Sequence, residues 1–298
     1  MTSETRVRRG QDATAVDAAE AAARTAGQAG VSLTELRDLA GLQAAAALYQ
    51  DVWQTDTRAA PVSPDLMRAL SHAGGYVAGA YDGDRLVAAS LAFHTGNDEA
   101  GLHSHISAVA PDVQGRDVGR ALKLHQRAWA LERGLRTISW TYDPLISRNA
   151  WFNVTKLGAR AIGYLVDFYG AMDDAQNAGD GGSDRAVALW DLGATYVRDA
   201  AAGHRRELDV NDLLRAGALI GLQTDADGKP EMSRVPAGAA CVLVQVPDDI
   251  QQLRRTDPLL ASRWRATSRE VLEPLLAGPY VTTGFTRTGW YVLEETPS

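Results

Sequence analysis

The sequence predicts a mixed α/β fold, because β-like runs and amphipathic helical segments alternate along it. Apolar residues form β-like runs over 75–81, 85–94 and 102–109, and then recur at helical spacing over 117–134. Hydrophobic residues make up 45% and charged residues 22% of the 298 residues, as in an ordinary globular protein. We therefore expect a twisted mixed sheet of about seven strands flanked by helices, followed by a C-terminal α/β extension.

The first elements follow a polar beginning. Residues 1–30 contain Ala, Gly, Thr and charged residues but almost nothing large and apolar, so they are predicted to be a disordered tail. A short strand is expected from Val31, and the apolar spacing over 39–53 predicts a helix. Ser63-Pro64 begins a second helix, since Ser is a good N-cap and Pro is tolerated at the first helical position.

The central elements are marked by turn residues. Asp82-Gly83-Asp84 joins the first two β-like runs as a hairpin, and Pro111 ends the third. The helix over 117–134 ends near Gly134. The elements expected next are a strand over 136–142, a helix over about 149–157 ending at Gly158, and strands over 162–169 and 186–192 separated by an acidic loop over 173–184.

The last third is less regular. A turn is expected at 225–228, followed by a strand, a helix over 257–276 and two strands within 239–293. The chain is thus predicted to divide into the tail, a domain over 31–193 and an extension over 194–298. The order of elements in the extension is similar to the end of the preceding domain, so a degenerate half-copy is kept as an alternative.

Charge and composition exclude several classes of partner. Thirty Lys and Arg against thirty-seven Asp and Glu give a net charge of −7, which offers no basic field for nucleic acid. No stretch approaches the roughly 20 apolar residues of a membrane span, and no apolar segment follows the first residues as in a secretory signal. The single cysteine, Cys241, lies in an apolar run, which favours a reducing cytoplasmic location.

The segment between Val109 and Ala121 carries the clearest chemistry. A strand ends at Val109, and a loop containing Gly115 leads directly into a helix, which leaves backbone N–H groups unpaired at the helix start. Such a helix start is an anion site, to which Arg116 and Arg120 would add charge. Neither G-x-x-x-x-G-K-S/T nor G-x-G-x-x-G is present, which argues against P-loop and Rossmann cofactors.

This segment resembles the acyl-CoA pyrophosphate loop of the GNAT superfamily of N-acyltransferases, whose pattern is Q/R-x-x-G-x-G/A. Gln114 and Gly119 match its first and last positions, and Asp117 stands where the family usually has Gly. Asp at this position is expected to turn outward or to cap the helix. The order of elements over about 31–192, with Asn149 ahead of Lys156-Leu157-Gly158, is also that of the family.

A narrower resemblance is to a bacterial group of predicted acetyltransferases that includes amino-acid N-succinyltransferase-like proteins. The segments that carry it are Ser104-His105, Asp143-Pro144-Leu145, Arg148-Asn149-Ala150, Asn153, Ser183-Asp184-Arg185 and Trp264 through Phe285. The resemblance implies acyl-CoA as co-substrate, either acetyl-CoA or succinyl-CoA, without a metal. It also implies a small-molecule amine or an amino acid as acceptor, and a homodimer is left open.

In the family the thioester lies against the splayed end of the strand expected over 102–109, whose backbone binds the pantetheine. The residues that the resemblance assigns to acyl-CoA binding are Val109, Gln114, Gly115, Arg116, Val118, Gly119, Arg120, Asn149 and Asn153. The two asparagines are equally compatible with helix caps or surface positions.

His103 and His105 are the candidate bases. They lie two residues apart, so on a strand both point to one face, and an imidazole titrates in the range that an amine acceptor requires. The alternative is a hydrogen-bonded structural role or a contact to a substrate carboxylate. Many relatives use a Tyr to protonate the thiolate where this chain has Val154, so Tyr142 becomes the candidate acid, with water or no acid as alternatives.

Two residues are candidates for the acceptor. Asp143 would bind an ammonium group, or else belongs to an ordinary Asp-Pro turn. Arg185 would bind a carboxylate of an amino acid or a succinyl group, or else forms an ion pair with Asp184. The His-x-His pair has no third and fourth ligand at a metal-binding spacing, so no metal is expected.

Together these observations predict an enzyme that transfers an acyl group from acyl-CoA to a primary amine by direct attack, since no activated Ser or Cys is apparent. A non-catalytic acyl-CoA sensor is the first alternative, because Asp117 and Val154 depart from the family pattern. A metal-dependent hydrolase built on His103 and His105 is the second.

Overall fold

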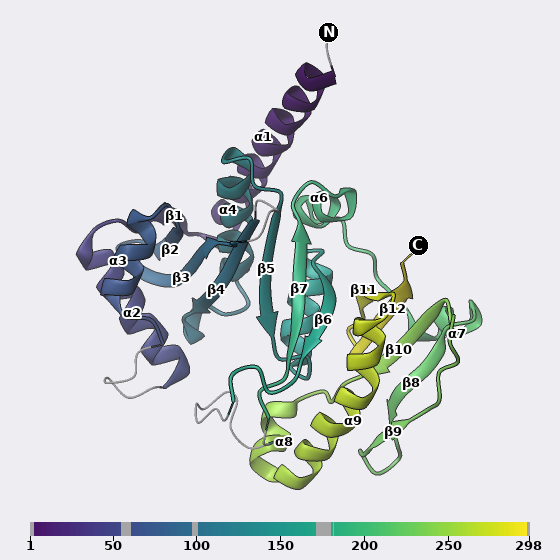
Figure 1. Ribbon diagram of the computed structural model, residues 1–298. Coiled ribbons are helices and arrows are strands. Elements are labelled where there is room, and N and C mark those ends of the chain that lie inside the picture. The colour runs from purple at the N-terminus through teal and green to yellow at the C-terminus, as the bar shows by residue number, and fades with distance from the viewer. Residues whose placement is uncertain (1–2, 55–60, 97–100, 171–179, 181, 297–298) are drawn as a thin grey trace. The chain divides into compact units, whose positions relative to one another are not determined.

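The computed structural model describes residues 3–54, 61–96, 101–170, 180 and 182–296, with side chains from residue 14 onward. The chain forms two compact units (Figure 1). The first unit contains residues 1–140 and 191–202, and the second contains residues 141–190 and 203–298. The predicted boundaries at 30/31 and 193/194 therefore differ from the boundaries between the compact units.

The first unit is built on a sheet. Its strands are β1 (Ser32–Glu35), β2 (Tyr76–Asp82), β3 (Arg85–His94), β4 (Gly101–Val109) and the beginning of β5 (Thr137–Tyr142). Neighbours from β1 to β4 are antiparallel, and β4 pairs with β5 in parallel. Gly83, at φ +59°, forms the tight β2–β3 turn that the Asp-Gly pair predicts.

Helices cover this sheet. They are α2 (Leu39–Trp53), α3 (Pro64–His72), α4 (Val118–Glu132) and α6 (Thr195–Ala202), with a 3-10 turn over Pro111–Val113. The backbone N–H of Leu66 donates to the Ser63 hydroxyl over 3.2 Å, which confirms the predicted cap of α3. Both α2 and α4 pack against β3 and β4, so the central strands form the buried layer of this unit.

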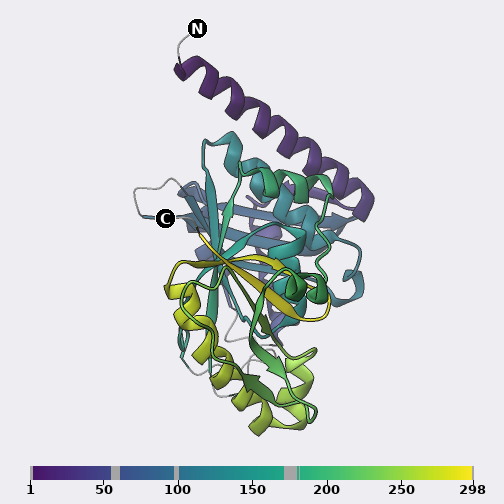
Figure 2. The same ribbon diagram turned by 90° about the vertical axis from the view of Figure 1, so that its right-hand side faces the viewer.

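The prediction of a disordered tail is wrong, because residues 3–29 form the helix α1 (Ser3–Ala29), drawn in purple in Figure 2. One face of α1 packs against α4 and α6. Its buried residues share small side chains: Ala18, Ala21, Ala22, Thr25, Ala26 and Ala29. Alanine has the highest helix propensity, and its short side chain lets two helices approach closely, so burial here needs no large apolar residue.

The second unit begins with a helix that changes its winding. α5 (Ser147–Ala150) continues as a π-helical turn over Trp151–Lys156 and ends before Gly158, which has the predicted left-handed backbone at φ +73°. β6 (Arg160–Leu165) and β7 (Arg185–Asp191) then pair in antiparallel fashion. Of the predicted loop over 173–184, residues 173–179 and 181 lie outside the described residues.

The rest of the second unit forms another sheet, with strand order β11-β12-β10-β8-β9. Its strands are β8 (Leu219–Thr224), β9 (Pro230–Met232), β10 (Cys241–Gln245), β11 (Tyr280–Phe285) and β12 (Trp290–Glu295). Its helices are α7 (Val210–Arg215), α8 (Ile250–Thr256) and α9 (Pro258–Ala277). No helix among the described residues is both long and apolar enough to cross a bilayer.

Candidate functional site

β4 and β5 separate partway along their length. The parallel ladder between them runs from Gly101–Thr137 to His103–Ser139 and ends there, although β4 continues to Val109. From Ser104 onward, β4 therefore pairs only with β3 among the described strands. Its other edge presents backbone N–H and C=O groups that no strand of this unit pairs with, as the expected splay requires.

A β-bulge lies where the two strands separate. Ser104 is opposite Ala92, and Ile106 is opposite Leu91, so His105 is an extra residue without a partner in β3. A bulge of this kind leaves the extra residue out of the regular ladder and turns the strand locally. The separation from β5 and the bulge thus fall within the same stretch of β4.

The connection from β4 to α4 has the backbone of an anion-binding loop. Gly115 has φ +87°, and Asp117, the residue before α4, has φ +60°. This left-handed backbone explains why glycine suits the position of Asp117, and Asp is among the few other residues that tolerate it. The expectation that Asp117 caps the helix is wrong, because its side chain makes no capping hydrogen bond. The start of α4 therefore has no side-chain cap from Asp117, and a helix start of this kind can offer backbone N–H groups to an anion.

The two arginines of this loop are held by other groups of the first unit. Arg116 binds the Asp82 carboxylate over 2.7 Å and the Ala29 carbonyl over 3.0 Å. The buried Arg120 donates to the Ala200 and Ala201 carbonyls of α6 over 3.0 and 2.9 Å. The prediction that Arg120 adds positive charge at the loop is therefore not supported by its side chain, which fixes α4 against α6; only its backbone N–H belongs to the helix start. Gln114 is exposed, and its amide donates to the Val109 carbonyl over 3.5 Å.

His103 and His105 lie together, as their spacing predicts. Their ring centroids are 6.3 Å apart, and the Phe93 ring lies 5.3 Å from His103 and 6.0 Å from His105. Burial lowers the pKa of both imidazoles, and the charges of His105 and Lys123 lower that of His103 further. Both rings are therefore expected to be neutral at pH 7 and able to accept a proton.

The sequence reasoning missed Lys123, a buried lysine of α4. Its Nζ donates to the Ser104 hydroxyl over 2.9 Å and to the Gln126 side-chain oxygen over 3.0 Å, and lies 4.0 Å from the centroid of the Trp140 ring. Burial lowers its pKa to about 7. Ser104 follows His103 on the strand, so the amine and the imidazoles are on opposite faces of β4. The sequence signal that could have identified Lys123 is the presence of a lysine within the apolar helical pattern of 117–134.

The remaining predicted residues belong to the second unit. Asp143 is buried and forms ion pairs of 2.5 Å with Arg254 and 2.8 Å with Arg265. Burial alone would raise its pKa, but Arg265 and Arg254 hold the pKa well below its usual range. The same two arginines bind Asp180 over 2.8 Å. The prediction that Asp143 binds a substrate ammonium is replaced by this internal network.

Arg185 is also buried, at the start of β7. Its Nη1 donates to the Asp184 carbonyl over 2.9 Å, and its guanidinium lies 5.2 Å from the centroid of the Tyr169 ring. The Asp184 carboxylate instead pairs with Arg269 over 2.7 Å and accepts from the Tyr164 hydroxyl over 2.7 Å. Arg185 stays a predicted carboxylate ligand.

Three further predicted residues occupy β5, α5 and its continuation. Tyr142 is buried, and burial raises the pKa of its phenol, so it stays protonated at neutral pH. Asn149 is half-buried in α5, and Asn153 is buried in the π-helical turn, where its backbone carbonyl accepts from Ala159 over 2.9 Å. The contacts of the two asparagines with described residues of this unit do not identify a ligand. Within the described residues, no group of three or more His, Cys, Asp or Glu side chains could hold a metal ion.

Comparison with known proteins agrees with this geometry. Residues 14–150 match the family described as "Acetyltransferase (GNAT) domain", beginning within α1 rather than at residue 31. No curated protein matches the chain in sequence.

Several solved structures are similar to about half of the chain. The ribosomal-protein-S18-alanine N-acetyltransferase from Escherichia coli has 16% identity over 55% of this chain and 96% of that chain, with a TM-score of 0.44. An N-acetyltransferase from Staphylococcus aureus Mu50 has 14% identity over 54% and 98%, with a TM-score of 0.45. A GNAT family acetyltransferase from Elizabethkingia anophelis with acetyl-CoA bound has 12% identity over 54% and 98%, with a TM-score of 0.43.

The family match covers β4, the loop after it and α4, which are the elements that carry the separated strand edge and the uncapped helix start. It confirms the family predicted from Gln114 and Gly119. Residues 14–150 are therefore identified as a GNAT acetyltransferase domain, whose reaction class is acyl-CoA-dependent N-acyl transfer.

Proposed function

We propose that the protein transfers an acetyl or succinyl group from acyl-CoA to the primary amine of a small molecule, with amino acids among the acceptors. The observation that carries this proposal is the separation of β4 from β5 after His103, on the same strand that leads into the uncapped start of α4. This arrangement supports binding of an extended anionic thioester along β4, with its charged end at α4.

Each part of the arrangement has a role in this proposal. The N–H groups of Val118, Gly119 and Arg120 would bind the diphosphate, and the free edge of β4 from Ser104 to Val109 would bind the pantetheine amides. Gln114 and Gly115 shape the loop, and Asn149 and Asn153 remain proposed pantetheine contacts. Acyl-CoA supplies the activated acyl group, and the protein supplies its orientation.

The chemistry needs one base and no covalent intermediate. His103 or His105 takes a proton from the acceptor ammonium, and the free amine attacks the thioester carbonyl. The new C–N bond forms and the C–S bond breaks. The leaving thiolate takes a proton from Tyr142 or water, and that donor is restored by the proton that the nitrogen loses as it becomes an amide. Neutral imidazoles suit this role, because only the neutral form accepts a proton.

The acceptor class follows from charge and from Arg185. A chain of net charge −7 favours a small amine over a basic protein surface bound to nucleic acid. Arg185 is proposed to bind a carboxylate of an amino acid or of a succinyl donor. A cytoplasmic location is proposed because the chain has a single cysteine. Whether the protein forms a homodimer is left open.

The alternative is a non-catalytic acyl-CoA sensor. It is favoured by Val154 at the position of the family's proton donor and by the Asp117 carboxylate beside the expected diphosphate site. Both alternatives predict acyl-CoA binding, and only the enzyme predicts amine-dependent release of CoA thiol.

Thermal unfolding of the full chain with acetyl-CoA, succinyl-CoA and CoA tests the binding step. A ligand at 100 times its dissociation constant should add about 2.7 kcal/mol of stability. Thiol release is then measured with a mixture of amino acids and small amines. Stabilisation with amine-dependent release supports the enzyme, and stabilisation without release supports the sensor. The absence of stabilisation by all three compounds would contradict both.

A further inference from the structure

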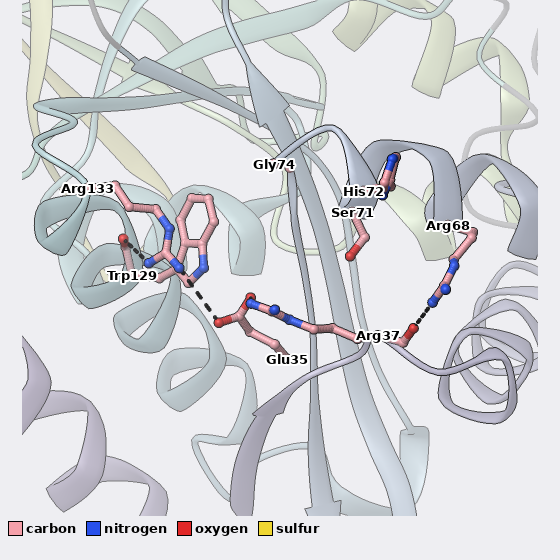
Figure 3. Close-up of a pocket in the computed structure, with 9 residues that line it drawn as sticks. Glu35, Arg37, Arg68, Ser71, His72, Gly74, Trp129 and Arg133 are labelled. Atoms are coloured by element: carbon pink, nitrogen blue, oxygen red, sulfur yellow. Dashed lines mark hydrogen bonds and ion pairs between the residues drawn. The ribbon is translucent and has the colours of Figure 1, made fainter.

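A depression in the first unit, away from the acyl-CoA elements, carries an unexpected charge. It has a volume of about 530 Å³ and is lined by Glu35, Arg37, Arg68, Ser71, His72, Gly74, Gly75, Trp129 and Arg133 (Figure 3). The lining holds three arginines and one carboxylate, so its Arg and Glu side chains carry a charge of 3 − 1 = +2. The whole chain carries −7, so this surface is opposite in sign to the molecule around it.

The arginines share too few acidic partners to be neutralised. Arg37 binds the Glu35 carboxylate over 3.0 Å. Arg133 approaches the other oxygen of the same carboxylate at 3.9 Å and the Glu132 carboxylate at 3.7 Å. Arg68 donates to the Arg37 backbone carbonyl and forms no ion pair with an acidic side chain in the part of the chain that the structure describes. Two carboxylates, Glu35 and Glu132, are thus paired with Arg37 and Arg133, and Arg68 pairs with neither.

The walls hold these groups in place. The Arg133 guanidinium lies 4.0 Å from the centroid of the buried Trp129 ring and donates to the Trp129 carbonyl over 3.1 Å. On the other side, Ser71 turns its hydroxyl toward Arg37, whereas His72 points away (Figure 3). Gly75 also lines the depression, and a Cβ there would lie 2.8 Å from the Leu70 carbonyl oxygen. A fixed guanidinium loses less freedom on binding an oxyanion than a mobile one.

The depression is separate from the proposed acyl-CoA loop. Trp129 and Arg133 lie at the C-terminal end of α4, whereas Val118 begins it. At 1.5 Å per residue, the helix places these ends about 22 Å apart. One anion therefore cannot occupy both places.

We propose that this depression is a second binding site, specific for a small multivalent oxyanion that bears phosphate or carboxylate groups. Planar guanidinium groups bind such oxygens in pairs, and Arg37 and Arg68 are exposed enough to receive them. The Ser71 hydroxyl adds a neutral donor. Glu35 is the group that the ligand competes with for Arg37 and Arg133.

Calorimetry tests this site by measuring the binding of pyrophosphate and of citrate to the full chain, at constant ionic strength in chloride. Comparison of the two anions distinguishes a site for phosphate groups from a site for carboxylate groups. Saturating CoA is present in every titration, so that the α4 loop is occupied. We expect Arg68→Gln and Arg37→Gln each to weaken binding of the preferred anion about tenfold. Arg37→Lys should weaken it less, because it keeps the charge but loses the planar pair of donors.

Removal of the competing carboxylate should act in the opposite direction. Glu35→Gln is expected to tighten binding by about threefold or more, because it releases Arg37 and removes one of the two carboxylates that pair with Arg133. Arg215→Gln, which alters an exposed arginine paired with Asp212 outside the depression, should leave binding unchanged. The proposal is overturned if neither anion binds in the presence of CoA, or if Arg37→Gln and Arg68→Gln bind as the unaltered chain does. Neither result depends on whether the protein transfers acyl groups.

Discussion

At the scale of single residues, Asp117 combines a backbone and a charge effect at one position. Its φ of +60° is a conformation that glycine and asparagine adopt readily, and its carboxylate lies at the start of α4, where a diphosphate is proposed to bind. The residue is thus tolerated by the backbone but unfavourable for an anionic ligand.

Asp117→Asn keeps the tolerated backbone and removes the charge. We expect the KM for acyl-CoA to fall about threefold, which corresponds to the modest energy of one charge at a helix start. Asp117→Ala should instead lower the free energy of unfolding by about 1 kcal/mol, because alanine is strained at positive φ. Asp112→Asn, on the same loop and paired with Arg85, is the control for charge alone. An unchanged KM in Asp117→Asn would place the ligand elsewhere.

The two histidines of β4 give a pH prediction. Burial lowers the pKa of both below 6.5, so the base is protonated and inactive only on the acid side of that value. The kcat/KM should therefore be constant from about pH 7 to pH 8 and fall at lower pH. His103→Gln or His105→Gln should reduce it about 10²- to 10⁴-fold and remove the acid limb. Full activity with an unchanged acid limb in both variants and in their double would assign the base elsewhere.

Lys123 gives a pH prediction about stability. Its pKa is 10.5 in the unfolded chain and about 7 in the folded protein, so between these values the unfolded state holds more protons. The free energy of unfolding should rise as the pH increases from 7 to 9, by up to about 1.4 kcal/mol per pH unit from this group. Below pH 7 the penalty for burying the charged amine is present in full.

Urea unfolding at pH 7, 8 and 9 measures this slope. Lys123→Met should lose it, because a thioether has no proton to release. Lys229→Met alters an exposed lysine paired with Asp227 and should keep it. Equal slopes in all three proteins would mean that Lys123 is charged in the fold.

At the scale of elements, α1 depends on small side chains. Ala22 is buried within the first unit, whereas Ala23, the next residue, is exposed. Ala22→Arg should lower the free energy of unfolding by about 2 kcal/mol or more, because a large charged side chain cannot fit between closely packed helices. Ala23→Arg, with the same helix propensity change, should have almost no effect. Equal melting temperatures for the two variants would show that α1 is not packed as described.

The elements also show what the sequence can predict. The hairpin at Gly83, the cap at Ser63 and the left-handed Gly158 follow from local backbone preferences, which a sequence displays directly. α1 was missed because its burial depends on close approach to α4, which no local pattern reveals. The family pattern identified Gln114 and Gly119, and the splay of β4 followed from it.

Two of the predicted site residues have partners that are distant in sequence. Asp143 is ion-paired with Arg254 and Arg265, more than 100 residues away, and Arg120 is bound by α6, about 80 residues away. A charged residue beside a motif resembles a ligand until its partner is known. The buried Lys123 was visible as a lysine within an apolar pattern, but its depth was not.

At the scale of the whole molecule, the net charge of −7 acts on every approaching substrate. Arg116 beside the α4 loop is already paired with Asp82, so it adds little field there. Salt screens long-range interactions, with a Debye length near 10 Å at 0.1 M. We expect kcat/KM for the anionic acyl-CoA to rise between 10 and 150 mM NaCl, and kcat/KM for a cationic amine to fall. Steady-state rates measured across this range of NaCl concentrations test the prediction. A fall in kcat/KM for both substrates would contradict it and would indicate a dominant local positive field at the site.

The return of the chain to the first unit over residues 191–202 affects how the protein is made. Arg120 and Arg127 are buried in α4; Arg120 donates to the carbonyls of Ala200 and Ala201 as well as to the Thr25 hydroxyl, and Arg127 donates to the Leu192 carbonyl. A ribosome that has released only the first 150 residues has released a family domain with two buried cations and none of these carbonyl acceptors. At about 5–20 residues per second, several seconds of further synthesis pass before α6 emerges. The nascent domain therefore reaches its native packing only after most of the chain has been translated.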